Sequence, residues 1–240
     1  MLELKPERVG LNEYNTQRIA LGGSAFIADQ SGALYCPAAD MLIVADLHLE
    51  KASSYARGGQ FLPPYDTRET LMRLAEVIDR FEAGHVVALG DSLHDRQAGA
   101  RIDAQDLEIL HIMQDDRRWT WITGNHDPEI PAILGGEVRA QVRTAGVTLR
   151  HEPHPGPVTH EIAGHMHPAA RLSMYGHSIR RPCFLGNGNR LILPAFGTLT
   201  GGLNVLDGAF LPLIGTGGMK VWMMGQEGLY PVATRRLRGD

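Results

Sequence analysis

Five short motifs, rich in aspartate and histidine, follow one another along this chain of 240 residues. In order they are Asp46-Leu47-His48, Gly90-Asp91, Gly124-Asn125-His126-Asp127, a single His151, and Gly164-His165-Met166-His167. Carboxylate, imidazole and amide groups are the ligands that manganese, iron(II) and zinc accept. Two such ions held about 3.5–4 Å apart can activate a water and neutralise a phosphate together. The motifs therefore predict a two-metal site for phosphoester chemistry.

Each motif alone has a plain structural explanation. Asp46 and His48 lie two residues apart, which puts both on one face at a strand end, but a solvated turn has the same pattern. Gly90 permits close backbone approach beside the carboxylate of Asp91. His165 and His167 repeat the two-residue spacing, and theirs is the most informative motif. Because all the motifs occur in one order, a shared metal site is favoured over unrelated turns.

Two positions need a choice of role. Asn125 offers a neutral oxygen ligand, whereas we expect His126 to lie over the phosphate, where it can protonate the leaving oxygen or stabilise charge. For the histidine between the third and last motifs, His151, His154 and His160 compete. We favour His151, because an apolar run ends there.

The elements that must position these residues are apolar runs, each followed by a motif. We expect strands at Met41 to Ala45, His85 to Leu89, Trp119 to Thr123, Val147 to Arg150 and Val158 to Ala163. Open α/β sheets place their sites past the carboxyl ends of such strands. Helices are expected at Thr67 to Phe81 and Asp103 to Gln114. A capping box at Asp66 and Glu69 should begin the first helix, and Gly84 should close it.

The last third of the chain has a different pattern. Arg181 to Gly186 and Asn189 to Pro194 flank Asn187-Gly188, which predicts a hairpin. Short strands are expected near Ala209 to Ile214, Lys220 to Met223 and Leu229 to Ala233. These runs suit the second sheet of a layered sandwich, so we predict a single domain over residues 1–240.

Composition limits the cellular setting. No apolar run approaches 18 residues, so no membrane span is expected. Met1 to Gly10 mixes charge with proline, and we expect no signal peptide. Cys36 and Cys183 lack metal-type or redox-type spacing, which favours buried free thiols and a cytoplasmic location.

Charge is unevenly distributed along the chain. The net charge is −4, yet residues 1–167 carry 15 Lys/Arg and 24 Asp/Glu, while residues 168–240 carry 8 and 3. Phosphate-rich partners respond to a local basic surface rather than to net charge. Arg180, Arg181 and Arg190 are therefore candidate contacts for a nucleic-acid strand or a partner. The alternative is a solvated surface without such a role.

From Leu42 to Gly202, the motifs resemble the calcineurin-like metallophosphoesterase superfamily. The resemblance implies an α/β fold: a four-layer αββα sandwich of two mixed sheets flanked by helices. It implies a first metal ion held by Asp46, His48, Asp91 and His167. It implies a second held by Asp91, Asn125, His151 and His165. A hydroxide between the ions would attack the phosphorus in line.

The flanking sequence narrows the resemblance. The runs Ala56-Arg57-Gly58-Gly59, Phe61 to Thr67, Pro194 to Thr198 and Gly201-Gly202 are similar to the bacterial ligase-associated DNA-damage-response metallophosphoesterases. Those proteins are described as endonucleases or phosphodiesterases. The resemblance implies DNA as substrate, a role in repair, and DNA ligase and helicase partners. The cofactors implied are two divalent ions, Mn²⁺ first, with Fe²⁺ and Zn²⁺ as alternatives.

One departure from the protein-phosphatase pattern bears on substrate. Three residues after Asp91 those phosphatases carry an aspartate, whereas this chain has His94, followed by Asp95. A histidine there resembles the nuclease branch, so His94 is expected to contact the phosphate. Asp95 could orient a histidine. Arg57, in the loop after the first motif, is a candidate for binding a non-bridging phosphate oxygen.

Two other functions compete with phosphodiester cleavage. One is a small-molecule phosphatase or nucleotide phosphodiesterase, although no cap domain is evident to enclose a small ligand. The other is a scaffold that binds partners without catalysis, although all seven ligand types are present. Because histidine must be neutral to bind metal, activity is expected to fall below about pH 6.

Overall fold

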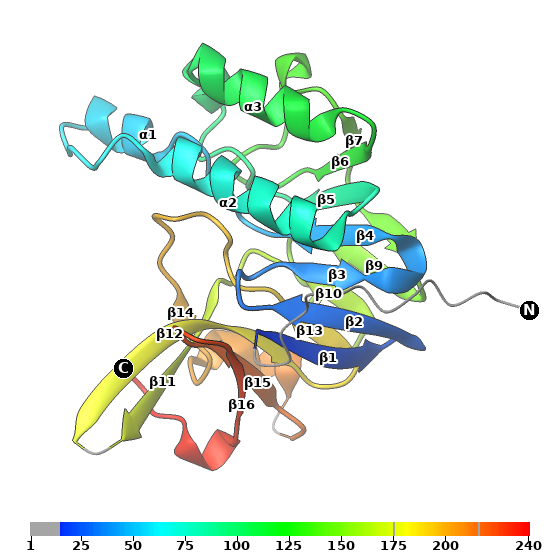
Figure 1. The fold of residues 1–240 in the computed structure, drawn as a ribbon. Helices are drawn as coiled ribbons and strands as arrows, with labels where there is room; N and C mark the ends of the chain where they lie inside the picture. The colour runs from blue at the N-terminus through cyan, green and yellow to red at the C-terminus, as the bar shows by residue number, and fades with distance from the viewer. Residues whose placement is uncertain (1–14, 175, 216) are drawn as a thin grey trace, which may run out of the picture.

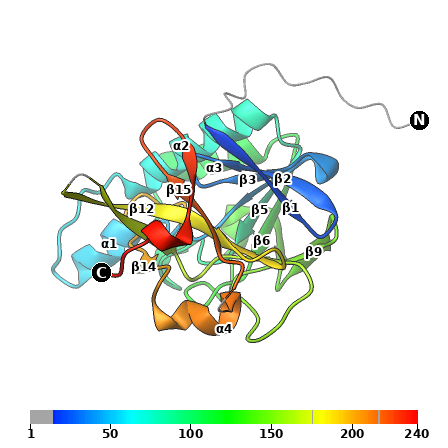
Figure 2. The ribbon, with the colours of Figure 1, turned by 90° about the horizontal axis from the view of Figure 1, so that it is seen from below.

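The computed structural model of the chain describes residues 15–174, 176–215 and 217–240 (Figure 1). Two mixed β-sheets pack face to face, with helices on the outside (Figures 1 and 2). No helix within the described ranges is both long and apolar enough to span a membrane. The stretch Met1 to Gly10, on which the signal-peptide expectation rests, lies outside the described residues.

The first sheet has seven strands in chain order. They are β1 (Thr16–Leu21), β2 (Ser24–Asp29), β3 (Leu34–Cys36), β4 (Met41–Val44), β5 (His85–Leu89), β6 (Arg118–Ile122) and β7 (Glu137–Arg139). The strands β4 to β7 run parallel, whereas β1 to β4 are joined as antiparallel neighbours. The carboxyl ends of β4, β5 and β6 therefore meet at one edge, and the first three motifs follow them.

The second sheet has nine strands, with a main path of β14-β11-β12-β13-β10-β9-β8 and a branch from β12 through β15 to β16. They are β8 (Val142–Thr144), β9 (Val147–Arg150), β10 (Glu161–Ala163), β11 (Pro168–Met174), β12 (His177–Gly186), β13 (Arg190–Ile192), β14 (Leu203–Asn204), β15 (Lys220–Met224) and β16 (Leu229–Val232). Its strands β9 and β10 run parallel to each other, and the last two motifs follow their carboxyl ends. These motifs meet the motifs of the first sheet, since the N–H of His165 donates to the carboxylate of Asp46.

Helices and cores complete four layers. The helices are α1 (Lys51–Arg57), α2 (Asp66–Phe81), α3 (Ala104–Gln114) and the short α4 (Leu211–Ile214). Side chains of α2 and α3 share one apolar core with β4 to β6, a second core fills the space between the sheets, and a third lies under α4. The predicted αββα sandwich is confirmed, although its fourth layer is thin.

The predicted capping of α2 is wrong. The helix begins at Asp66 itself, after Tyr65, and no side chain caps it. The carboxylate of Asp66 accepts a hydrogen bond from the backbone N–H of Ala52 instead, at 3.1 Å. The helix ends at Phe81 because Glu82 takes a left-handed φ of 47°, two residues before the expected glycine. The side chain predicted to cap the helix thus ties α1 to it.

A second prediction fails in the last third. The strand expected at Ala209 to Ile214 is a 3₁₀ turn followed by α4. Asp207 accepts a hydrogen bond from the N–H of Ala209 at 2.8 Å, and a proline stands in the first turn of α4, where a missing N–H costs nothing. The hairpin around Asn187-Gly188 is confirmed, with Leu185 opposite Ile192. Both cysteines are buried and free, as predicted.

Candidate metal centre

The site lies where the strands of the two sheets end. The loops after β4 and β5 run side by side, because the N–H of His48 donates to the carbonyl of Asp91 at 2.9 Å. From the second sheet, the N–H of His165 donates to both carboxylate oxygens of Asp46, at 3.1 and 3.0 Å. The backbone thus fixes residues from three motifs against one another.

Five of the predicted ligands have a left-handed backbone. Their φ values are 55° for Asp46, 46° for His48, 46° for Asp91, 68° for His165 and 42° for His167. Such conformations cost on the order of 1–3 kcal/mol each for a residue with a side chain, and they gather at functional sites. The surrounding fold therefore holds these side chains in place against their local preference.

The first cluster contains Asp46, His48 and His167, whose ligand atoms all lie within 4.8 Å of one another. Nε2 of His48 lies 3.3 Å from Nε2 of His167, and that atom lies 3.4 Å from Oδ1 of Asp46. The three atoms come from the loop after β4 and the loop before β11. They converge on one point, as ligands of a single ion would.

The second cluster contains Asp91, His151 and His165, with Asn125 beside them. Nδ1 of His151 lies 2.8 Å from the carbonyl oxygen of Leu89, to which it donates, so that Nε2 is the nitrogen that faces the cluster. That Nε2 lies 2.9 Å from Oδ1 of Asn125 and 3.4 Å from Oδ1 of Asp91. It also lies 3.1 Å from Nδ1 of His165. Acceptor atoms that face one another in this way need a cation between them, which is either a metal ion or a proton on Nε2 of His151.

Both clusters fit a divalent metal ion. Their donors are carboxylate, imidazole and amide oxygen, which suit manganese, iron or zinc. Two glycines allow the close approach: a Cβ on Gly124 would stand 2.2 Å from Oδ1 of Asp91, and one on Gly90 would stand 2.6 Å from the ring of His151. A side chain at either position would displace a ligand. The glycines of the motifs thus make room for the site.

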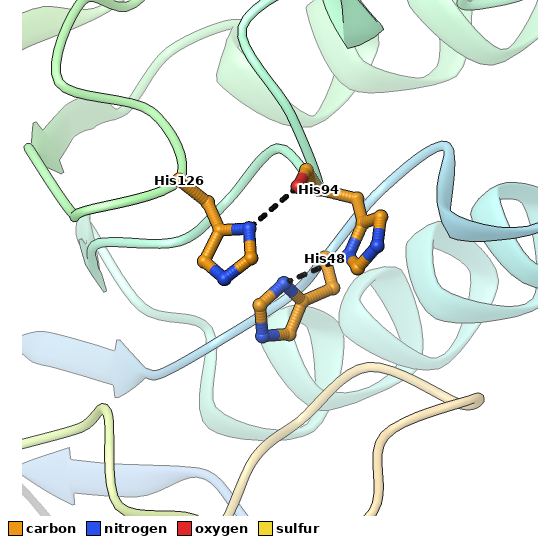
Figure 3. Close-up of side chains that lie close together, drawn as sticks. All are labelled: His48, His94 and His126. Carbon is orange, nitrogen blue, oxygen red and sulfur yellow. Dashed lines mark hydrogen bonds between the residues drawn. The ribbon is translucent and has the colours of Figure 1, made fainter. Parts of the chain in front are cut away.

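A third group of nitrogens lies beside the first cluster and contains His48, His94 and His126 (Figure 3). Nδ1 of His48 lies 3.4 Å from Nδ1 of His94, and Nδ1 of His126 donates to the carbonyl oxygen of His94 at 2.7 Å. A neutral imidazole has one lone pair, so His48 can serve only one of the two groups. The cluster with Asp46 supplies a negative charge, which leaves His94 and His126 available to a substrate.

Burial and neighbouring charges act in opposite directions on the site histidines. Burial, together with the nearby His167, lowers the pKa of His48 to about 3. Burial also lowers the pKa of His165. For His151 burial acts the same way, but the hydrogen bond and charge of Asp91 and the charge of Asp46 outweigh it and raise the pKa to about 9. In the absence of metal, the second cluster therefore holds a proton that an ion must displace.

Asp127 ends the third motif, and the sequence assigned it no role. Its carboxylate accepts hydrogen bonds from the backbone N–H groups of Asp91, Ser92, Leu93 and Gly124, at 2.7–3.0 Å. Burial raises its pKa to about 6. It clamps the loop that carries Asp91 to the loop that carries Asn125. The signal was its place in the motif, but its partners are backbone atoms that a sequence does not reveal.

Two of the other predicted residues lie next to the site. Asp95 pairs with Arg101 at 2.6 Å, and none of its hydrogen bonds within the described ranges goes to a histidine. Arg57 is exposed, and its guanidinium donates to the side chain of Gln97 in the same loop as Asp95.

Burial decides between the three candidate histidines for the metal ligand, and it also decides whether Arg190 can contact a nucleic-acid strand. His154 is exposed and His160 is half-buried, whereas His151 is buried within the second cluster. The prediction that Arg190 is available to a strand is wrong, because it is 1% exposed and pairs with Glu161 at 2.6 Å inside the second sheet.

Comparison with known proteins finds a relative of this chain among the solved structures. Neither protein-family models nor curated sequences give a match. Among solved structures, the nuclease MPE of Pseudomonas putida is 30% identical, with a TM-score of 0.70, over 91% of this chain and 100% of that one. The chain belongs to the metallophosphoesterase family. The resemblance drawn from the motifs is thereby confirmed at the level of the family.

Two more distant structures are also similar to this metallophosphoesterase. The phosphoesterase YfcE of E. coli is 16% identical over 80% of this chain and 98% of that one, with a TM-score of 0.40. The protein AQ665 of Aquifex aeolicus, described as of unknown function, is 18% identical over 53% and 77%, with a TM-score of 0.36. As a member of its family the chain is a metal-dependent phosphoesterase.

Proposed function

We propose that this metallophosphoesterase is a dinuclear phosphodiester hydrolase that acts on DNA in repair. The observation that carries the proposal is the pair of ligand clusters, one on Asp46 and one on Asp91, with an exposed histidine beside them. The first ion would be held by Asp46, His48, Asp91 and His167. The second would be held by Asp91, Asn125, His151 and His165. When bound, two divalent ions would neutralise phosphate charge and activate the attacking water. Mn²⁺ is the metal that we favour, with Fe²⁺ and Zn²⁺ as alternatives.

The chain's own proton donor in this proposal is His126. Its Nδ1 is fixed by the carbonyl oxygen of His94 at 2.7 Å, which turns Nε2 toward the centre, 4.0 Å from Oδ2 of Asp91. Its side chain is 41% exposed, so a substrate can reach it. Nε2 would protonate the leaving oxygen, a role that contributes typically 10²–10⁴-fold in rate.

Two further residues are assigned to substrate binding, and a third to positioning one of them. His94 lies between His48 and Tyr55, with ring centroids 5.4 and 5.8 Å away, and would contact the phosphate. A histidine at this position, three residues after Asp91, supports a phosphodiester substrate over a phosphoprotein. Asp95, held by Arg101, would keep the loop of His94 in position rather than touch substrate. Arg57 would hold a non-bridging phosphate oxygen or the strand backbone.

The cellular assignments rest on likeness and composition. The likeness to a Pseudomonas putida nuclease supports a nucleic-acid substrate. The ligase-associated motifs support a role beside a DNA ligase and a helicase. Two buried free cysteines support the cytoplasm, where thiols stay reduced.

The proposal is tested by hydrolysis of bis(p-nitrophenyl) phosphate against p-nitrophenyl phosphate in manganese. His126→Ala is the control for catalysis by the site. We expect faster cleavage of the diester, dependent on both metal and His126. Preference for the monoester would favour a small-molecule phosphatase. Absence of turnover with manganese, iron and zinc would favour a binding scaffold.

A further inference from the structure

A small pocket against β11 and β12 is lined by His167, which belongs to the first ligand cluster. It has a volume of about 120 Å³. Arg180, Thr200 and Gly202 also line it. The carbonyl oxygen of Gly202 accepts a hydrogen bond from Nη2 of Arg180 at 2.5 Å. A guanidinium is therefore fixed in a pocket that is also lined by His167 of the first cluster.

Arg180 has a second arginine beside it. In the pairing of β11 with β12, Arg171 lies directly opposite Arg180. Like charges at directly opposed positions repel each other. Residues 237–240, called the tail below, relieve this repulsion. Nη1 of Arg171 donates to the carbonyl of Gly239 at 3.2 Å, and Nε of Arg180 donates to Oδ1 of Asp240 at 3.1 Å. Arg180 thus already holds an anion, the carboxylate of Asp240, with Arg171 beside it.

The bond to Asp240 is exposed and is not what holds the tail. The side chains of Arg180 and Asp240 are 39% and 53% exposed, and exposed pairs contribute little to stability. The tail is held separately, because the N–H of Arg238 donates to the carbonyl of Arg171 at 2.9 Å and Leu237 is buried in the third core. A competing anion could therefore replace the carboxylate and leave the tail in place.

We propose that Arg180, with Arg171 opposite it, binds a phosphate adjacent to the scissile one in a nucleic-acid strand, and that Asp240 occupies this subsite until the strand displaces it. The inference rests on the proposed function and adds the path of the substrate. Arg binds phosphate through two parallel N–H donors, as it binds a carboxylate, so one ligand can replace the other. The substrate class is a strand with at least two consecutive phosphates.

The test compares two substrates that differ in neighbouring phosphates. Thymidylyl-(3′→5′)-thymidine has one phosphodiester and nothing for the subsite, whereas an oligothymidylate of about ten nucleotides fills it. The measured quantity is the ratio of kcat/KM on the oligomer to kcat/KM on the dimer, in manganese. Because the dimer reports folding and metal loading, damage to either cancels in the ratio.

Two variants should move this ratio in opposite directions. Arg180→Ala should lower it about fivefold, and the plot of log affinity against log salt should become shallower by about 0.7, the value for one phosphate contact on a single strand. Asp240→Asn should raise the ratio about twofold by removing the competing charge. Arg143→Ala is the matched control, since Arg143 is exposed on β8 at the opposite edge of the sheet. It should leave the ratio unchanged.

The outcomes that overturn the subsite differ from those that overturn the proposed function. If Arg180→Ala alters the ratio no more than Arg143→Ala, or if Asp240→Asn lowers it, the subsite is wrong. If the wild-type protein cleaves neither substrate in any metal, the proposed function fails, and the subsite fails with it.

Discussion

The two ligand clusters differ in how firmly the chain holds them. Each cluster has two buried ligands and one partly exposed histidine. In the second, the backbone carbonyl of Leu89 fixes the ring of the buried His151. In the first, the side chain of His167 is 21% exposed and also lines the pocket of Arg180. We infer that the second position holds its ion as part of the fold and that the first position meets the substrate.

The largest effect is expected from a residue that serves both clusters. Asp91 is the residue that our proposal shares between both ions. Its replacement by alanine should lower kcat/KM on a diester by about 10³-fold or more, since charge stabilisation at both positions is lost. Metal content, measured on the dialysed protein, should fall below that of single-histidine variants. A variant that keeps two ions and its rate would show that Asp91 is not shared.

Replacement of His126 should separate catalysis from metal binding. We expect His126→Ala to lower kcat by about 10²–10³-fold, because it removes the general acid while leaving both clusters intact. The metal content should equal that of the wild type. A substrate with a good leaving group, such as p-nitrophenolate, should lose less than a nucleotide substrate does. An equal loss on both substrates would argue against proton donation.

Asp127 should affect the second cluster before the first. Asp127→Asn replaces one acceptor oxygen with a donor that faces backbone N–H groups, so the loops of Asp91 and Asn125 separate. Replacing such supporting groups typically costs 10–100-fold in metal affinity. We expect this loss for the ion of the second cluster in manganese titrations, with secondary structure retained in circular dichroism. Unchanged affinity would limit Asp127 to a role in folding.

Acidity should weaken the clusters differently. Because the pKa of His151 is raised to about 9, the metal-free protein is charged there at neutral pH, and affinity for the second ion should fall about tenfold per pH unit below 9. His48, with a pKa of about 3, adds no such dependence to the first site above pH 4. The raised pKa of His151 also stabilises the metal-free protein below about pH 6.5, and this is lost as the pH rises through 9. Manganese titrations at pH values from 6 to 9 check the statements on the affinity of the two sites.

The smallest effect concerns the metal-free fold. His151→Ala removes a buried ring and its bond to Leu89, which should cost about 1–3 kcal/mol and lower Tm by roughly 3–8 °C. His167→Ala removes a partly exposed ring and should lower Tm by less than about 2 °C. Thermal unfolding in chelator measures both. Equal shifts would mean that the clusters do not differ in how the fold holds them.

The sequence predicted what depends on local patterns. The apolar runs His85 to Leu89 and Val147 to Arg150 gave strands with the observed bounds, whereas the strand expected from Val158 begins only at Glu161. The motifs after the predicted strands gave residues that the structure brings into two clusters. The strand expected at Ala209 to Ile214 failed because Asp207 caps a helical turn there.

Other features depend on contacts between distant segments. The backbone clamp at Asp127 and the carboxylate of Asp240 on Arg180 depend on segments that only the fold brings together. The left-handed φ of ligands such as Asp46 is likewise imposed by the surrounding structure. No motif or periodicity in the chain contains that information.

The most direct test of a two-ion centre is anomalous diffraction from crystals grown with manganese. We predict two peaks, one among Asp46, His48 and His167 and the other among Asp91, Asn125, His151 and His165. A single peak, or one centred between His48, His94 and His126, would contradict the assignment of ligands and the function built on it.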